Sequence, residues 1–184
     1  RVVRIAVAHS LRIAPELPVA TNGAPFAIHL AEGVNLAAAD EVRELDERGL
    51  VTRDLLAVHA VGVDARGIQR LRAAGAAVVW CPSSNRFLFG HTAPAELLAP
   101  GIDVLLGSDS LLTADGSLLR ELHVARDLGL VSHARLLDAV GGTAAKRLGV
   151  ELPSLDVGSR ADVIVLRRPL LEATEADIAL VVAN

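Results

Sequence analysis

Five short apolar runs recur along the chain, and most are separated by longer stretches in which polar and apolar positions alternate. The runs occupy residues 2–8, 25–30, 55–61, 76–82 and 102–108. Each run is nearly continuously apolar, as in strands that are covered on both faces of a sheet. Strands alternating with helices are typical of a parallel sheet with helices outside it, so the predicted fold class is α/β.

The stretches between and after these runs carry helix signals. The stretch 36–50 is amphipathic and contains a helix-stop residue, Gly49, and the stretch 64–76 begins at Asp64, a type preferred at helix starts. Two more helical stretches are expected at 116–130 and 132–150. The connection 9–24 between the first two apolar runs is expected to be short or irregular, and the C-terminal tail contains two β segments, 158–169 and 177–184.

Composition excludes several classes of partner. The chain has 184 residues, a formal net charge of −4 and 52% hydrophobic residues, which suits one soluble domain of ordinary size. Mild acidity, the lack of a basic patch and an aromatic content of 2% argue against nucleic acid as a partner. No apolar run reaches the length of a membrane span and no signal peptide is recognisable, so no membrane partner is expected.

A single cysteine, Cys81, excludes an internal disulfide and fits a reducing compartment, so a cytoplasmic location is expected. The segment CPSSN (81–85) invites a reading as a catalytic nucleophile, which we disfavour because no activating base stands near it in sequence. Ser83, Ser84 and Asn85 are instead predicted to satisfy backbone groups in a loop beyond the fourth strand.

Ionisable residues stand where several predicted strands end. His29, His59 and Asp109 follow the second, third and fifth apolar runs, and His9 follows the first. The carboxyl ends of parallel strands are where ligands and catalytic groups gather. A buried, hydrogen-bonded histidine beside a solvated Glu32 would explain the segment FAIHLAEG (26–33) alone, but the repetition over several strands favours a functional site.

The residue types at these strand ends suit metal-assisted hydrolysis. Imidazole nitrogen and carboxylate oxygen bind divalent metals, and a bound metal lowers the pKa of a bound water to near neutrality. A neighbouring carboxylate such as Glu32 can then move a proton from the water to the leaving group. Ser108 and Ser110 flank Asp109 and either orient its carboxylate or simply close the turn.

Several segments together resemble a known family. IHLAEG, VHAVGVD, GAAVVWCPSSNRFLFG, GIDVLLGSDSLLTADGSLLRELHVA, AAKRLGV and LDVGSRADVIVL follow one another along the chain. In this order they are similar to the C-terminal part of amidohydrolase-superfamily enzymes, in the branch that holds cytosine, guanine and S-adenosylhomocysteine deaminases and the triazine chlorohydrolases. The resemblance implies a TIM-type (β/α)8 barrel, represented here by strands four to eight in residues 1–150, and a segment of a small composite β-sandwich in residues 151–184.

The resemblance also implies roles for individual residues. His29 and Asp109 would bind one divalent metal, with zinc favoured over iron. Glu32 would carry the proton and Asp109 would also act as a base. His59 would act in catalysis and contact the substrate, with His9 as a further substrate contact. The implied activity is hydrolytic deamination of a purine-like, pyrimidine-like or related heterocycle by metal-activated water.

The chain departs from the family pattern at its start. The His-x-His pair of the first barrel strand, which supplies two metal ligands in the family, is missing, and so are the first three βα units. Residues 1–150 fall short of the roughly 200 residues or more of a whole barrel. The chain starts at Arg1 and contains no methionine, so we expect a fragment that forms a homo-oligomer or needs an N-terminal half. The alternative is a catalytically inactive, truncated barrel that serves as an interaction module.

Overall fold

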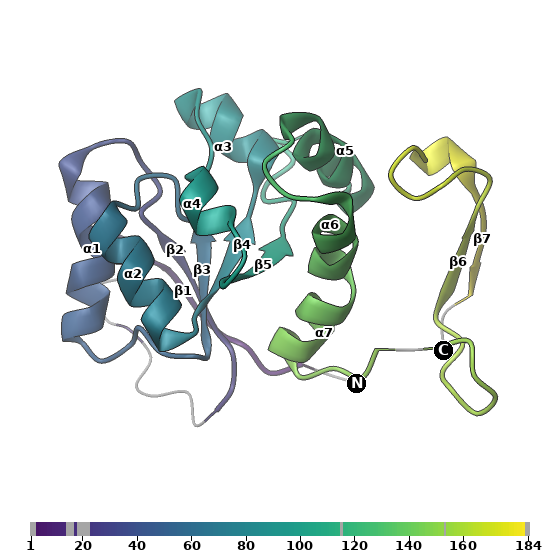
Figure 1. Ribbon diagram of the computed structural model, residues 1–184, viewed down its shortest axis with the longest axis horizontal. Helices are drawn as coiled ribbons and strands as arrows, with labels where there is room; N and C mark the ends of the chain where they lie inside the picture. Colours follow the sequence, from purple (N-terminus) through teal and green to yellow (C-terminus); the bar gives the residue numbers. More distant parts are fainter. Residues whose placement is uncertain (1–2, 14–16, 18–22, 115, 153, 183–184) are drawn as a thin grey trace.

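Five parallel strands form one sheet in the computed structural model, which describes residues 3–13, 17, 23–114, 116–152 and 154–182 (Figure 1). The strands pair with their sequence neighbours in the order β1 to β5. Their bounds are β1 (Ala6–Ser10), β2 (Phe26–Leu30), β3 (Leu55–His59), β4 (Ala77–Trp80) and β5 (Asp103–Leu106). The α/β class predicted from the apolar runs is confirmed.

Helices connect the strands from β2 onward and continue after β5. They are α1 (Leu36–Glu47), α2 (Ala65–Ala74), α3 (Pro82–Phe89), α4 (Ala95–Leu98), α5 (Leu118–Leu128), α6 (His133–Val140) and α7 (Gly142–Leu148). Side chains of Asn35, Asp64 and Ser117 accept hydrogen bonds from the first turns of α1, α2 and α5, which fixes where these helices begin. Figure 1 shows α1 beside α2 at one flank and α5 to α7 at the other.

The two faces of the sheet are covered unequally. Ile28, Leu55 and Trp80 belong to a large buried cluster that also takes in residues of α1, α2, α5 and α6. The opposite face carries a much smaller cluster around Leu56 and Leu105, against which Ala144 and Leu148 pack. On the edge strand β1, Val7 remains 70% exposed. The second face therefore lacks the apolar cover that the first face has.

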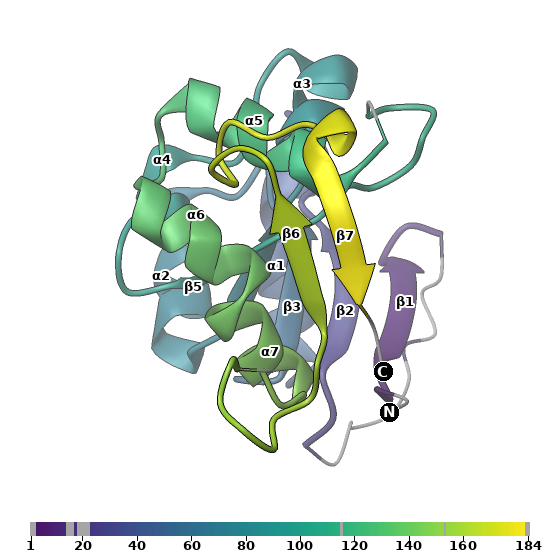
Figure 2. The same ribbon diagram turned by 90° about the vertical axis from the view of Figure 1, so that its right-hand side faces the viewer.

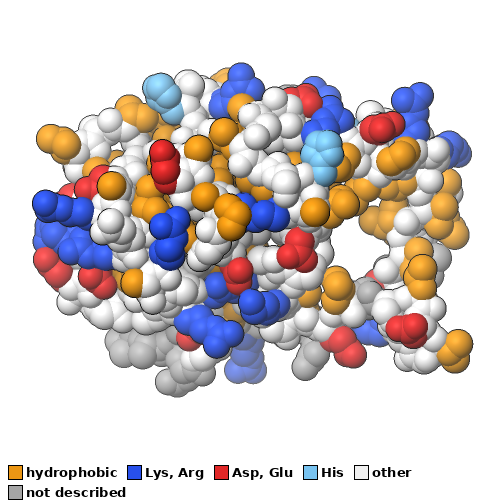
Figure 3. Space-filling view, in the orientation of Figure 1, with side chains coloured by type: hydrophobic (Ala, Val, Ile, Leu, Met, Phe, Trp, Pro, Cys, Tyr) orange, Lys and Arg blue, Asp and Glu red, His pale blue; other side chains and the backbone are white. Residues whose placement is uncertain are grey.

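A separate hairpin follows the helices. Strands β6 (Val163–Leu166) and β7 (Ile178–Val182) pair antiparallel and are joined through a short 3-10 helix, Glu175–Asp177. Figure 2 shows the hairpin in front of the helices and the sheet, and Figure 3 shows an opening between the hairpin and the rest of the molecule. Contacts occur through its connecting loop, where Ala173 is buried and the Leu171 carbonyl accepts a hydrogen bond from Arg126 on α5.

The sequence pattern located most elements correctly, and the differences have local causes. The predicted helix 132–150 is two helices that meet at Gly141. The loop predicted at 83–85 is wrong, because Pro82 begins α3 and the Asn85 N–H donates to the Cys81 carbonyl at 3.0 Å. Most of the connection 9–24 lies outside the described residues. None of the described helices is long and apolar enough to cross a membrane.

One arginine joins α7 to the amino ends of three strands. Arg147 Nε donates to Asp103 Oδ2 at 2.8 Å, while Nη1 and Nη2 donate to the carbonyls of Arg53 at 2.6 Å and Gly75 at 2.8 Å. Arg53 and Gly75 each lie two residues before the starts of β3 and β4, and Asp103 is the first residue of β5. The Arg147 side chain is only 11% exposed, so these bonds are partly shielded from water.

We expect Arg147→Ala to lower the free energy of unfolding by about 1–3 kcal/mol, because one guanidinium makes all three bonds. Lys146→Ala is the matched control, since Lys146 contacts the same Asp103 carboxylate from an exposed position and should change stability by no more than about 0.5 kcal/mol. Urea unfolding of the two variants measures both values. Equal losses would contradict a bridging role for Arg147.

Candidate active site

Three side chains at the ends of β2 and β3 form a compact polar cluster. His29, Glu32 and His59 each offer one ligand-type atom, and these atoms all lie within 4.8 Å of one another. The His29 and His59 rings meet edge to face with centroids 4.9 Å apart. The structure thus brings together three of the residues that the sequence analysis singled out.

Unusual backbone conformation places His59 in this cluster. In the parallel register His29 lies opposite Val58, whereas His59 lies opposite Leu30, so regular alternation would put the two histidines on opposite faces. His59 has φ of 67°, and this left-handed conformation swings its Cα–Cβ bond to the face of His29. Ala60 follows with φ of 52°, and Ala31, just after β2, has φ of 51°.

His29 and Glu32 form a hydrogen-bonded pair. His29 Nδ1 lies 3.1 Å from Glu32 Oε2, and both side chains are partly exposed. The hydrogen bond that His29 donates to Glu32 raises the pKa of His29, against the opposing effect of burial, and the same bond lowers the pKa of Glu32. Glu32 is therefore held as a carboxylate, which accepts protons and binds cations.

Asp109 stands beyond β5 and is tied to α3. Its φ of 53° is also left-handed. Ser84 on α3 and Thr113 both donate to its Oδ2, and the Thr113 bond measures 3.1 Å. Burial opposes ionisation of Asp109, but the bond from Ser84 and the nearby His59 outweigh it and leave the pKa of this carboxyl below its usual value.

Ser84 and Thr113 take the orienting role for which the flanking Ser108 and Ser110 were candidates. The charge of Asp109 raises the pKa of His29, although Asp109 is not in the 4.8 Å cluster of described ligand-type atoms. The sequence paired His29 with Asp109 as ligands. In the structure, His29 has Glu32 and His59 as close ligand-type neighbours.

Asn85 is a site residue that the sequence analysis assigned to loop backbone. Its Oδ1 lies 2.8 Å from His59 Nδ1, and both side chains are fully buried. The other ring nitrogen, His59 Nε2, is buried, makes no hydrogen bond to the described residues and lies 3.7 Å from Glu32 Oε1. The only signal in the sequence is an amide side chain three positions after Pro82. Its role can be recognised only when residues 82–89 are known to form the helix α3.

His9 and Cys81 differ in their relation to this cluster. The His9 ring lies 4.8 Å from the His29 ring, centroid to centroid, and its side chain is exposed at the end of β1. Cys81 is buried, and burial raises the pKa of its thiol. This environment supports the expectation that Cys81 is not a nucleophile. His9, in contrast, lies close enough to His29 to contact a ligand bound there.

The loops after β2 and β3 are closely joined. The Gly62 N–H donates to the Ala31 carbonyl at 2.9 Å, and the Ala60 N–H donates to the Leu30 carbonyl at 3.1 Å. A Cβ at Gly62 would lie 2.4 Å from the Gly33 carbonyl oxygen, so only glycine allows this approach. These contacts fix the position of Glu32 relative to His59.

The cluster fits a divalent metal by its chemistry. Two imidazoles and a carboxylate are ligand types that zinc and iron accept. The buried, unpartnered His59 Nε2 faces the same space, and a buried polar atom normally has a partner. The described residues therefore provide nitrogen and oxygen donors at the carboxyl edge of the sheet.

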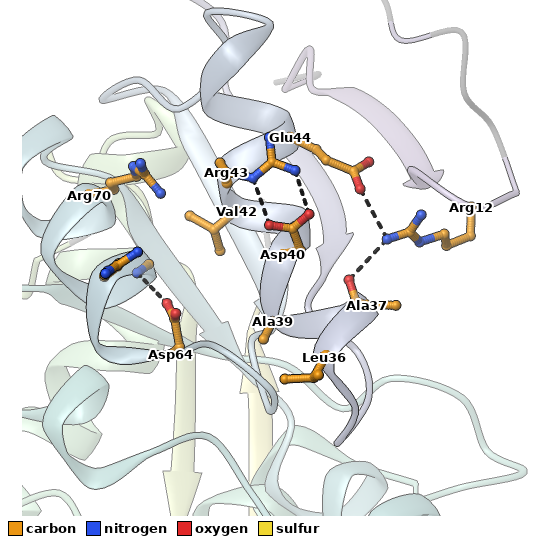
Figure 4. Close-up of a pocket in the computed structure, with 12 residues that line it drawn as sticks. Arg12, Leu36, Ala37, Ala39, Asp40, Val42, Arg43, Glu44, Asp64 and Arg70 are labelled. Carbon is orange, nitrogen blue, oxygen red and sulfur yellow. Dashed lines mark hydrogen bonds and ion pairs between the residues drawn. The ribbon is translucent and has the colours of Figure 1, made fainter.

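A hollow of about 610 Å³ lies elsewhere, on the outer side of α1 and α2 (Figure 4). Its charged side chains pair with one another: Arg43 bonds Asp40, and Arg12 bonds Glu44. Figure 3 shows basic side chains gathered over this flank, and those that line the hollow are Arg12, Arg43, Arg66 and Arg70. The hollow contains none of the clustered residues.

Curated relatives match most of the chain, although no family model does. A 5-methylthioadenosine/S-adenosylhomocysteine deaminase of Pyrococcus furiosus is 31% identical over 179 residues, covering 86% of this chain and 42% of the relative. An S-triazine hydrolase of Gordonia rubripertincta is 31% identical over 134 residues, covering 66% of this chain and 28% of the relative. The chain thus spans less than half the length of these relatives.

Solved structures share the fold. An adenosine deaminase of Xanthomonas campestris with bound zinc matches 87% of this chain and 44% of its own, with a TM-score of 0.73 and 21% identity. An atrazine chlorohydrolase of Arthrobacter aurescens, complexed with zinc, matches 86% of this chain and 42% of its own, with a TM-score of 0.67 and 23% identity. With its sequence relatives and its fold in agreement, the chain belongs to the amidohydrolase superfamily, in the group of these deaminases and triazine hydrolases.

Proposed function

We propose that the chain is part of a metal-dependent hydrolase that deaminates a purine-like, pyrimidine-like or related heterocycle. The observation that carries the proposal is the cluster of His29, Glu32 and His59, whose ligand-type atoms lie within 4.8 Å at the carboxyl ends of β2 and β3. Relatives that are 31% identical are named as a deaminase and a triazine hydrolase, which supports hydrolysis at a ring carbon.

His29 and Asp109 are the proposed metal ligands of this chain. A bound divalent metal would supply Lewis acidity that makes water reactive near neutral pH. Zinc is favoured because the adenosine deaminase and the atrazine chlorohydrolase both carry it, and iron is the alternative. Catalytic zinc usually has three protein ligands, so the remaining ligands would come from His59 or another segment of the whole protein.

Glu32 is the proposed proton carrier. Its carboxylate accepts a proton from the attacking water, whose oxygen bonds to the aminated ring carbon. The same carboxyl group then delivers the proton to the departing nitrogen, and ammonia leaves. His59 Nε2, which faces Glu32 at 3.7 Å, contacts the substrate and the charge that develops on it, while Asp109 assists as a base and His9 makes a further substrate contact.

The five-stranded sheet is proposed to be strands four to eight of a (β/α)8 barrel within residues 1–150. The sparsely covered face of β1 to β5 would line the interior of the barrel, and β1 and β5 would pair with further strands. Residues 151–184 would add the β6–β7 hairpin to a small β-sandwich. The missing strands would come from an N-terminal half or, less simply, from another copy of the chain.

A non-catalytic interaction module is the second candidate. The exposed apolar residues Ile5 and Val7 on or beside the edge strand β1 favour it, since natural proteins avoid leaving such an edge open. Under this reading the chain would pair with another polypeptide without binding metal. Metal affinity therefore separates the two candidates.

We expect the purified chain to bind zinc and His29→Ala to weaken binding by more than about 100-fold, because a ligand nitrogen is lost. His91→Ala is the matched control, since His91 is exposed beyond α3 and should leave the affinity unchanged. Titration calorimetry with zinc chloride measures both. A folded wild-type chain without zinc affinity would favour the interaction module.

Glu32→Gln should reduce ammonia release by about 10²- to 10⁴-fold and leave zinc affinity nearly unchanged, because the amide keeps the size of the side chain but accepts no proton. The assay follows ammonia from aminated purine nucleosides, pyrimidines and triazines. Loss of zinc together with activity would show that Glu32 is a ligand and not the proton carrier.

A further inference from the structure

The buried polar side chains of the described residues surround or support the candidate site. They are Glu41, His59, Ser84, Asn85 and Glu121. Ser84 and Asn85 lie on the short helix α3, and each bonds a residue singled out for the site. A polar side chain without water needs its partners inside the protein, so the geometry of α3 is tied directly to that of the site.

Asn85 holds His59 at two points. Its Oδ1 lies 2.8 Å from His59 Nδ1, and its Nδ2 donates to the His59 backbone carbonyl at 3.5 Å. The second contact fixes the orientation of the amide, because only the NH₂ group can donate to a carbonyl. The oxygen therefore faces the ring, and an oxygen that accepts a hydrogen bond requires a proton on Nδ1.

We infer that Asn85 is a positioning residue that keeps the proton of neutral His59 on Nδ1 and leaves Nε2 unprotonated toward Glu32. An unprotonated Nε2 can bind a metal or accept a proton, whereas the other tautomer would present an N–H. The inference about the tautomer stands on the contacts alone, and its consequence for ligand binding rests on the proposed function.

The second contact also supports the strained backbone of His59. Left-handed φ is uncommon outside glycine and costs free energy, so it persists only where surrounding contacts hold it. The bond from Asn85 Nδ2 to the His59 carbonyl is one such contact, and the bond from the Ala60 N–H to the Leu30 carbonyl is another. Asn85 thus fixes both the ring and the turn of His59.

Helix α3 is itself anchored from behind. The Ser83 N–H donates to Glu121 Oε2 on α5 at 3.1 Å, at the first turn of α3. Ser84, the next residue, donates to Asp109. The anchor and the two site contacts come from three consecutive residues, which lets one short helix set the positions of His59 and Asp109 together.

Nitrogen-15 NMR of the histidine rings in the metal-free chain tests the inference, at a pH about two units above the ordinary histidine pKa of ~6.5. His59→Gln identifies the signals of the residue. We expect wild-type His59 to show a protonated Nδ1 and an unprotonated Nε2. Asn85→Leu should shift the population toward the Nε2–H tautomer, while Asn85→Asp, which keeps the acceptor, should restore Nδ1–H.

Arg86→Ala is the matched control, because Arg86 follows Asn85 on α3 and its side chain is exposed. It should leave the tautomer unchanged. An Nε2–H tautomer in the wild type, or an unchanged tautomer in folded Asn85→Leu, would overturn the inference. If Asn85→Leu does not fold, the wild-type and Asn85→Asp spectra decide, since both must show Nδ1–H.

Zinc affinity gives a second readout that depends on the proposed function. We expect Asn85→Leu to weaken zinc binding about 10- to 100-fold and Asn85→Asp to weaken it less. A chain that shows the expected tautomers but binds no zinc would refute the metal site and leave the role of Asn85 intact. A chain that binds zinc with an Nε2–H tautomer would refute the role of Asn85 and leave the metal site intact.

Discussion

The candidate site depends on the turn that the backbone makes where β2, β3 and β5 end. Ala31, His59, Ala60 and Asp109 all lie in the left-handed region, which L-residues with a side chain rarely adopt. Without the turn at His59, strand alternation would direct its imidazole into the apolar layer under the helices, away from His29. Without the turn at Asp109, its carboxylate would not be directed as it is toward Ser84 and Thr113. The local strain is offset by hydrogen bonds that neighbouring segments supply.

Two buried carboxylates illustrate how those bonds are supplied. Glu41 on α1 accepts the Ala31 N–H at 2.8 Å, and Glu121 on α5 accepts the Ser83 N–H. Each carboxylate holds a backbone N–H beside a site residue, from a helix that packs outside the sheet. Burial raises the pKa of Glu41, and the bond from Ala31 and the nearby Arg12 oppose that rise. The helices therefore do more than cover the sheet, because they fix the loops at its carboxyl edge.

The sequence predicted the fold class and most strand positions because apolar runs of strand length are a strong local signal. It also singled out His29, Glu32 and His59, since ionisable residues at the ends of apolar strands are easy to recognise. It did not predict α3, because a short helix that begins with Pro-Ser-Ser-Asn has weak helical periodicity and resembles a turn. The roles of Ser84 and Asn85 could not be predicted either, because their side-chain partners lie 25 and 26 positions away in the sequence. Thr113 lies only four positions from Asp109, but its contact depends on the conformation of the loop after β5. Positive φ at His59 and Asp109 was equally hidden, because neither residue type requires it.

The close approach of Gly62 to the Gly33 carbonyl has a consequence for motion. The loop after β2 carries Glu32 and the loop after β3 follows His59, and two backbone hydrogen bonds join them where no side chain fits between. Opening one loop alone would break these hydrogen bonds, so the two loops are expected to move together when this edge of the sheet fluctuates. The spacing between the Glu32 carboxylate and the His59 imidazole is thereby preserved when this edge of the sheet moves.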